Sequence, residues 1–226
     1  MQRYAIYYAP QPGGLAEVTA RWLGWDPVQG VAVPHADAAI AAFTETPRKY
    51  GFHGTIKPPF RLAEGQTVEA LMAAVAALAA RLTPVTLPGL RLDTIEGFVA
   101  LLPEGDTAAL ADLAAEVVVA LDGFRAPPSD AEIARRRPDR LSERQRSLLA
   151  EWGYPYVLDQ FQFHLTLTGQ LPEVQAQAAM AVLEPLLAPH LPRPFALHDL
   201  VLFGEAADGR FHILHRYPLT GSSTSG

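Results

Sequence analysis

Polar and apolar side chains alternate along two short stretches of this chain, 50–57 and 160–168. In each stretch a His, one spacer, a Thr and an aliphatic residue follow aromatic residues, a pattern that predicts a β-strand. Alternate side chains of a strand share a face, so the His and Thr of each stretch point the same way. The four residues concerned are His53, Thr55, His164 and Thr166. Lys57 joins the first pair if that strand continues beyond Ile56, and Thr168 joins the second.

The rest of the pattern predicts further strands and helices. Period-two alternation predicts strands over 3–9, 85–93, 97–102, 156–168, 195–203 and 210–219, with a loop or short strand over 28–34. The first His-x-Thr strand is expected to end at Pro58-Pro59. A period of 3.6 predicts helices over 15–25, 37–43, 66–82, 107–121 and 172–187.

Each His-x-Thr strand is followed by the same order of elements: helix, strand, turn, strand. The two motifs lie about half the chain length apart, which indicates an internal duplication. Two related lobes around a pseudo-twofold axis would bring the two histidines face to face. The alternative is two unrelated, half-buried core histidines that form local hydrogen bonds.

The segment 124–153 differs in composition from the rest of the chain. It holds seven of the 18 Lys and Arg residues and two Ser-x-x-Glu/Gln patterns, which are typical of capping boxes at helix starts. Pro138 separates the two patterns, and Gly153 can end the second helix. We expect a helical hairpin inserted into a single bilobal domain of residues 1–220. The Gly- and Ser-rich segment 221–226 is expected to form a disordered tail.

Composition narrows the classes of function. The chain has 226 residues, 49% of them hydrophobic, and a net charge of −6, which argues against a general nucleic-acid coat protein. It has no cysteine, so disulfide and thiolate chemistry are excluded. No apolar run reaches membrane-spanning length, and the start of the chain does not resemble a signal peptide. We therefore expect a cytoplasmic protein without membrane partners. Its oligomeric state is open, with a monomer as the simplest form.

The paired His and Thr residues suit phosphate chemistry. An imidazole can move protons near neutral pH, and hydroxyl groups can hold phosphate oxygens. The neighbouring residues that we expect to bind substrate are Lys57, Arg48, Tyr50 and Tyr154. The alternatives are a solvated strand end for Lys57 and half-buried packing for Tyr154. The Arg-rich hairpin is either a lid or a solvated helical face. We expect no metal site, because the other histidines do not form a ligand pair.

These motifs resemble a known superfamily. Two His-x-Thr-aliphatic motifs in a duplicated α/β chain are similar to the two-histidine (2H) phosphoesterases, which include RNA 2′,3′-cyclic phosphodiesterases and 2′–5′ RNA-ligase-like proteins. The stretches 3–10, 47–60, 152–156 and 161–169 resemble one bacterial branch that is associated with phosphonate metabolism. The resemblance covers the chain apart from its tail.

The resemblance implies a bilobal α+β fold with a central cleft. It also implies hydrolysis of a cyclic phosphate or phosphodiester without a metal or other cofactor. By motif position, His53 and His164 would be the catalytic pair, and Thr55 and Thr166 would hydrogen-bond the phosphoryl oxygens. One histidine would act as base and the other as acid, and the sequence leaves open which is which.

Three functions are compatible with these residues. The first is a phosphodiesterase for a small phosphorylated substrate, such as a phosphoribosyl cyclic phosphate from phosphonate breakdown, as the resemblance implies. The second is an RNA-end enzyme, which the acidic net charge disfavours and the Arg-rich hairpin keeps open. The third is a module that binds a nucleotide or sugar phosphate without reacting.

Overall fold

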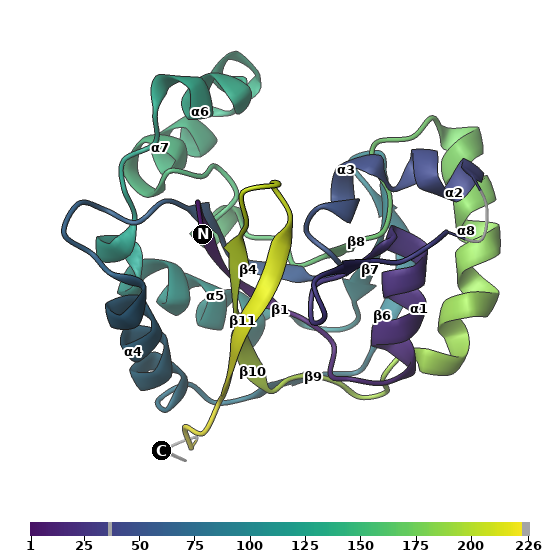
Figure 1. The fold of residues 1–226 in the computed structure, drawn as a ribbon, viewed down its shortest axis with the longest axis horizontal. Coiled ribbons are helices and arrows are strands. Elements are labelled where there is room, and N and C mark those ends of the chain that lie inside the picture. The colour runs from purple at the N-terminus through teal and green to yellow at the C-terminus, as the bar shows by residue number, and fades with distance from the viewer. Residues whose placement is uncertain (36–37, 223–226) are drawn as a thin grey trace.

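The centre of the molecule is a seven-stranded antiparallel sheet (Figure 1). A computed structural model describes residues 1–35 and 38–222. In sheet order the strands are β11 (Phe211–Pro218), β10 (Asp199–Glu205), β1 (Tyr4–Tyr8), β4 (Gly54–Phe60), β8 (Leu165–Thr166), β7 (Phe98–Pro103) and β6 (Leu90–Ile95). Two short ribbons pair β2 (Trp25–Asp26) with β3 (Val31–Ala32) and β5 (Val85–Leu87) with β9 (Phe195–Leu197).

Helices pack against this sheet and confirm the predicted α+β class. They are α1 (Gly14–Leu23), α2 (Ala38–Phe43), α3 (Glu45–Arg48), α4 (Val68–Ala79), α5 (Ala108–Ala120), α6 (Asp130–Arg135), α7 (Glu143–Trp152) and α8 (Glu173–Leu187). Short 3₁₀ turns occur at η1 (Asp122–Phe124), η2 (Pro138–Arg140), η3 (Leu158–Gln160) and η4 (Ala188–His190). In Figure 1, α4 and α5 lie on the left and α1 and α8 on the right, with β4 between them.

The main core lies between the sheet and these helices. Helix α4 contacts β10 and β11, α5 contacts β4, and α8 contacts β6 and β7. Ile56, Leu101 and Leu165 are among the fully buried side chains of this core. Burial of each such side chain stabilises the fold by roughly 1.5–3 kcal/mol. The central strands that carry the two motifs are therefore held by one continuous apolar layer.

The fold contains a pseudo-twofold repeat. One copy runs β1–α1–β4–α4–β5–β6 and the other β7–α5–β8–α8–β9–β10. The two motif strands, β4 and β8, pair with each other at the centre, and β5 pairs with its counterpart β9. Strand β10 of the second copy pairs with β1 of the first, and β6 of the first copy pairs with β7 of the second. Each copy thus supplies an outer strand to the other lobe. The predicted order of helix, strand, turn and strand follows each motif strand. Each repeat, however, begins with the strand before its motif strand, β1 before β4 and β7 before β8.

The Arg-rich segment forms a helical hairpin, α6 and α7, as predicted. Both capping boxes are present, Ser129 with Glu132 and Ser142 with Gln145. Gly153 ends α7 in the left-handed conformation at φ 72°, a geometry that favours glycine. The hairpin lies beside the start of the chain at the upper left of Figure 1.

Several predicted boundaries were wrong. Of the strand predicted over 156–168, only Leu165–Thr166 is a regular β-strand, and Leu158–Gln160 is the 3₁₀ turn η3. The region 85–93 contains two strands, β5 and β6, separated at Pro88-Gly89. Strand β4 does not end at Pro58-Pro59 but continues to Phe60, because bulges in its pairing with β1 accommodate residues without an N–H donor.

Two predicted segments fall partly outside the described residues. Of the helix predicted over 37–43, the structure describes Ala38–Phe43, and Asp37 lies outside it. Of the predicted tail, residues 223–226 lie outside the described part. The backbone N–H of Gly221 donates to the carbonyl of Leu82 at 2.9 Å.

Candidate active site

The two motifs meet at the middle of the sheet. Gly54 of β4 pairs with Leu165 of β8 in antiparallel register. In such a register the residues that flank the pair stand opposite each other on one face, so His53 faces Thr166 and Thr55 faces His164. A Cβ atom on Gly54 would overlap the ring of Phe163, which explains the glycine at this position. The sheet therefore presents the two imidazoles and two hydroxyls that the motifs predicted on one surface.

His53 is held as a neutral ring. Its Nδ1 donates to the carbonyl oxygen of Gly51 at 2.9 Å, and the ring of Tyr7 stacks on it with centroids 4.0 Å apart. Burial lowers the pKa of His53 to about 4; the Gly51 hydrogen bond opposes this shift, and nearby His164 adds to it. A neutral imidazole that donates through Nδ1 carries its lone pair on Nε2. His53 is therefore equipped to accept a proton through Nε2.

His164 repeats this local geometry. Its Nδ1 donates to the carbonyl oxygen of Gln162 at 2.9 Å, again two residues earlier in the chain. A carbonyl can only accept, so Nδ1 must carry a hydrogen. Both histidines thus present Nε2 as their free nitrogen.

The two motif threonines are available to a ligand. The structure gives neither Thr55 nor Thr166 a side-chain hydrogen bond within the part of the chain that it describes. Thr168, predicted to share their face, differs: its buried hydroxyl accepts from the Val99 N–H at 3.0 Å and donates to the Gly169 carbonyl at 2.9 Å. Thr168 therefore fixes the end of the motif.

Two adjoining recesses form one cleft over these side chains. The first, of about 210 Å³, is lined by His53 and the second, of about 270 Å³, by His164. Thr55, Thr166 and Tyr154 line both recesses, so the hydroxyls lie between the imidazoles. We call this combined space the histidine cleft.

Of the four predicted substrate-binding residues, the two tyrosines line the histidine cleft. The ring of Tyr50 lies 5.5 Å from that of His53 between centroids. The ring centroids of Tyr154 and Tyr156 lie 5.8 Å apart, and burial raises the pKa of the Tyr154 phenol. Both are placed to contact a bound molecule.

The prediction for Lys57 was wrong. Its Nζ is buried, donates to the Val118 carbonyl at 3.0 Å and lies 3.4 Å from Asp122 Oδ1. Tyr7 pairs with Thr55 and Ile6 pairs with Lys57, so Ile56 is an extra residue, a β-bulge, in β4. The bulge interrupts the alternation of side chains between the two faces of the sheet, and Lys57 therefore lies on the face opposite to Thr55. Burial lowers the pKa of Lys57 to about 8, against the effect of Asp122.

Arg48 also lies away from the cleft, contrary to prediction. Its guanidinium donates to the carbonyls of Leu23 at 3.1 Å and Ala41 at 2.5 Å, and to the Thr44 hydroxyl at 3.2 Å. Because Arg48 ends α3, its side chain is directed back toward α1 and α2. It joins these helices together.

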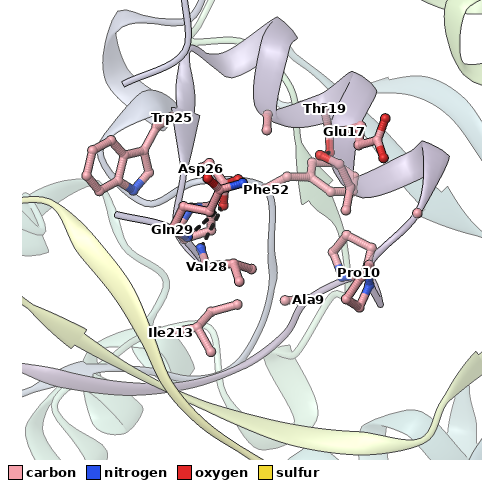
Figure 2. A pocket seen from close by; sticks show the side chains of 15 residues that line it. Ala9, Pro10, Glu17, Thr19, Trp25, Asp26, Val28, Gln29, Phe52 and Ile213 are labelled. Atoms are coloured by element: carbon pink, nitrogen blue, oxygen red, sulfur yellow. Dashed lines mark hydrogen bonds between the residues drawn. The ribbon is translucent and has the colours of Figure 1, made fainter. Parts of the chain in front are cut away.

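A second pocket lies apart from the histidines, between α1, the β2–β3 turn and β11 (Figure 2). Its walls are mainly apolar and include Trp25, Phe52 and Ile213. Its two charged side chains are the carboxylates Glu17 and Asp26, which repel an anion. This pocket is unsuited to phosphate.

The family follows from comparison with known sequences. A family model described as "Protein of unknown function (DUF1045)" matches residues 55–212, which include both motifs except His53. This chain belongs to the DUF1045 family.

Curated relatives of this DUF1045 chain are longer proteins. The chain is 35% identical over 189 residues to "Ribose 1,5-bisphosphate phosphokinase PhnN" of Janthinobacterium sp. (strain Marseille), covering 80% of the chain and 42% of the relative. It is 38% identical over 183 residues to the protein of the same name from Laribacter hongkongensis (strain HLHK9), covering 79% and 43%. The chain spans less than half the length of these relatives.

Solved structures similar to the DUF1045 chain show low identity. A phosphoesterase matches with 19% identity and a TM-score of 0.45, over 97% of this chain and 98% of that one. TT0787 of Thermus thermophilus matches with 15% identity and a TM-score of 0.47, over 97% and 99%. E. coli LigT complexed with 3′-AMP matches with 18% identity and a TM-score of 0.43, over 97% and 98%.

Sequence reasoning missed two residues of the site in this DUF1045 chain. Tyr7, which stacks on His53, is on the face of β1 opposite to Ile6, and only the pairing of β1 with β4 reveals that role. Arg136 of the hairpin also lines the cleft, and its guanidinium lies 4.5 Å from the Tyr154 ring centroid. The sequence feature that could have identified Arg136 is the cluster of arginines in 124–153.

The structure describes residues 1–35 and 38–222 of the DUF1045 chain. No group of three or more His, Cys, Asp or Glu in this part of the DUF1045 chain is arranged to hold a metal ion. None of the described helices has the length and apolar character needed to cross a bilayer.

Proposed function

We propose that this protein is a phosphodiesterase that opens a small cyclic phosphate by general acid–base catalysis. The observation that carries the proposal is the placement of two Nε2 atoms and two unengaged threonine hydroxyls over one sheet face. Hydrolysis of a phosphodiester needs a base for water, an acid for the leaving oxygen and donors for the phosphoryl oxygens. The four side chains supply one group for each of these tasks.

In the proposed reaction His53 is the base. Its neutral Nε2 takes a proton from water as the water oxygen bonds to phosphorus. His164, protonated, gives its Nε2 proton to the leaving oxygen as the phosphorus–oxygen ester bond breaks. Thr55 and Thr166 donate to the non-bridging oxygens. Transfer of the proton from His53 to His164 through solvent restores the starting state, and the net change is hydrolysis.

The sheet supports this division of roles. Tyr7, which stacks on His53, pairs with Thr55, whereas Ala100 pairs with Thr166. Ala100 is therefore the pseudo-twofold counterpart of Tyr7. The phenol ring of Tyr7 removes more water from its neighbouring histidine than the methyl group of Ala100 can. The protonated form is therefore disfavoured at His53.

The substrate class is proposed from cleft size and from the curated relatives. Recesses of about 210 and 270 Å³ suit a small molecule. The relatives are named for ribose 1,5-bisphosphate, a phosphorylated sugar, and we propose a phosphoribosyl cyclic phosphate as the substrate. Phosphokinase activity is not proposed for this chain, whose sequence contains no Gly-Lys pair and hence no P-loop.

Phosphorus NMR of the purified protein, in the presence of a chelator, tests the proposal. The panel contains a phosphoribosyl cyclic phosphate, a nucleoside 2′,3′-cyclic phosphate and an RNA ending in a 2′,3′-cyclic phosphate. We expect conversion of a sugar cyclic phosphate to a phosphomonoester, reduced about 10²- to 10⁴-fold in His53→Ala and His164→Ala. His198→Ala is the matched control, because this exposed histidine does not line the cleft.

The other outcomes separate the competing functions. Turnover of the RNA alone would replace the proposal by an RNA-end enzyme. Binding of panel members without turnover would indicate a binding module. Activity that disappears with chelator and returns with a divalent metal would contradict the metal-free acid–base scheme.

A further inference from the structure

A cationic recess adjoins the histidine cleft. We name it the arginine recess; it has a volume of about 220 Å³ and lies between β4, the start of β1 and the hairpin α6–α7. Tyr50 and Arg136 line both this recess and the His53 side of the histidine cleft, so the two spaces adjoin each other. The cationic side chains of its lining are Arg3, Lys49, Arg61, Arg125, Arg135 and Arg136.

Three of these cations are neutralised by carboxylates. Arg3 donates to both oxygens of Glu205 at 2.5 and 2.7 Å. Arg125 donates to both oxygens of Asp122 at 2.8 and 3.0 Å. Arg61 lies 3.0 Å from Glu132, the one carboxylate within the lining.

The other three cations have no carboxylate partner among the described residues. Lys49 lies over the ring of Tyr50 at 4.7 Å, and Arg136 over that of Tyr154 at 4.5 Å. Arg135 donates only to the carbonyl of Ala131, at 3.2 Å. Aromatic faces orient a cation without cancelling its charge. About three positive charges therefore face one small recess in a chain whose net charge is −6.

The walls of the recess are fixed to the body of the protein. Arg61, which follows β4, donates to the Pro127 carbonyl at 2.9 Å and to Glu132 of α6. Arg125 donates to the Glu151 carbonyl of α7 at 3.0 Å. The paired arginines thus hold the hairpin in place, and the unpaired cations are left for an anion.

We infer that the arginine recess binds a second phosphate group of the substrate, a subsite that rests on the proposed function of the cleft. Lys49, Arg135 and Arg136 would contact a phosphomonoester dianion while the cyclic phosphate occupies the space between the histidines. Lysine and arginine side chains occur on one side only among the described residues: the opposite recess, lined by His164, has no Lys or Arg and contains the carboxylate of Glu96. A recess of about 220 Å³ suits a single extra phosphate, whereas a polynucleotide needs a cationic groove that continues along its backbone.

The first test measures binding without turnover. Ribose 5-phosphate, a phosphomonoester with no cyclic ester, is titrated calorimetrically into the wild type, Arg136→Gln and Arg140→Gln. Arg140 is the matched control, an exposed arginine of the same hairpin that does not line the recess. We expect Arg136→Gln to weaken binding about tenfold or more and Arg140→Gln to leave it unchanged. Absence of binding to the wild type, or equal binding to both variants, would overturn the inference.

The second test compares kcat/KM for the phosphoribosyl cyclic phosphate and for the same compound without its monoester. We expect the wild type to prefer the phosphorylated form about tenfold or more, and the preference to approach one in Lys49→Gln/Arg135→Gln/Arg136→Gln. Equal turnover by the wild type would overturn the subsite and leave the proposed function standing. Binding in the first test without turnover in the second would support the subsite and overturn the proposed function. A preference for cyclic-phosphate-terminated RNA over both sugars would overturn the subsite.

Discussion

Replacing His53 by Asn should change how the stability of the fold depends on pH. Asn does not titrate, and its side-chain amide can retain the donation to the Gly51 carbonyl. In the wild type the pKa of His53 is lowered to about 4, whereas an unfolded histidine titrates near 6.5. Between pH 6.5 and 4 the unfolded chain therefore binds one proton that the folded chain does not. The wild type loses stability relative to His53→Asn as the pH falls through this window.

The size of the effect follows from the same shift. Each pKa unit corresponds to about 1.4 kcal/mol, so the difference between pH 7 and pH 4 is at most about 3 kcal/mol. Because His53 is half-buried and reached by solvent from the cleft, we expect about 2 kcal/mol. All other titrating groups are common to both proteins, so their contributions largely cancel in the difference.

Urea unfolding followed by tryptophan fluorescence at pH 7, 6, 5 and 4.5 measures this difference directly. Trp22 and Trp25 are buried and report on the folded state. A stability difference that stays constant within about 0.5 kcal/mol over this range would refute the reasoning, because His53 would then titrate like an unfolded histidine. Acidification that favours the wild type would mean a raised pKa and would remove the basis for a neutral His53 base.

Three further predictions follow from the site. Thr55→Val and Thr166→Val keep the shape of the side chain and remove its hydroxyl donor to the phosphoryl group. Steady-state assays should therefore show kcat lowered about a hundredfold in each variant. An unchanged kcat would show that the threonines do not take part in the reaction. Lys57→Met should retain turnover within about threefold, because Lys57 is buried away from the cleft. It should lower the free energy of unfolding by roughly 1–3 kcal/mol, because the Val118 carbonyl loses its donor. A loss of turnover as large as in His53→Ala would contradict this position of Lys57. Gly54→Ala should destabilise the protein in urea by about 1–3 kcal/mol through overlap with Phe163, and wild-type stability would show that the ring can move aside.

Side-chain alternation was sufficient to predict the faces of the motif residues. Phe163, Leu165 and Leu167 are buried on one side, while His164 and Thr166 lie on the other, although only two residues of this stretch form a hydrogen-bonded strand. Alternation is a property of an extended backbone. The hydrogen-bonded ladder depends on neighbours from distant parts of the chain, which local sequence does not specify.

Features set by distant pairing could not be predicted in this way. The bulge at Ile56 that turns Lys57 into the core exists only relative to β1. Arg48 is directed by the short helix α3 toward carbonyls of α1 and α2, and no local pattern identifies those acceptors. Local capping signals, in contrast, were reliable: Ser129 and Ser142 form both predicted boxes.

The exchange of strands between the two repeats has a consequence for how such a chain could arise. The last strand of each repeat, β6 or β10, pairs with the first strand of the other repeat, β7 or β1. A single repeat would lack that partner strand, so it could build this sheet only as a homodimer whose two chains exchange their last strands. In a homodimer both imidazoles would have identical surroundings, and any residue that tuned one would tune the other. Joining the copies in one chain removes that constraint: Tyr7 and Ala100 can differ, so an aromatic ring can cover His53 without a matching ring at the equivalent position of the other copy.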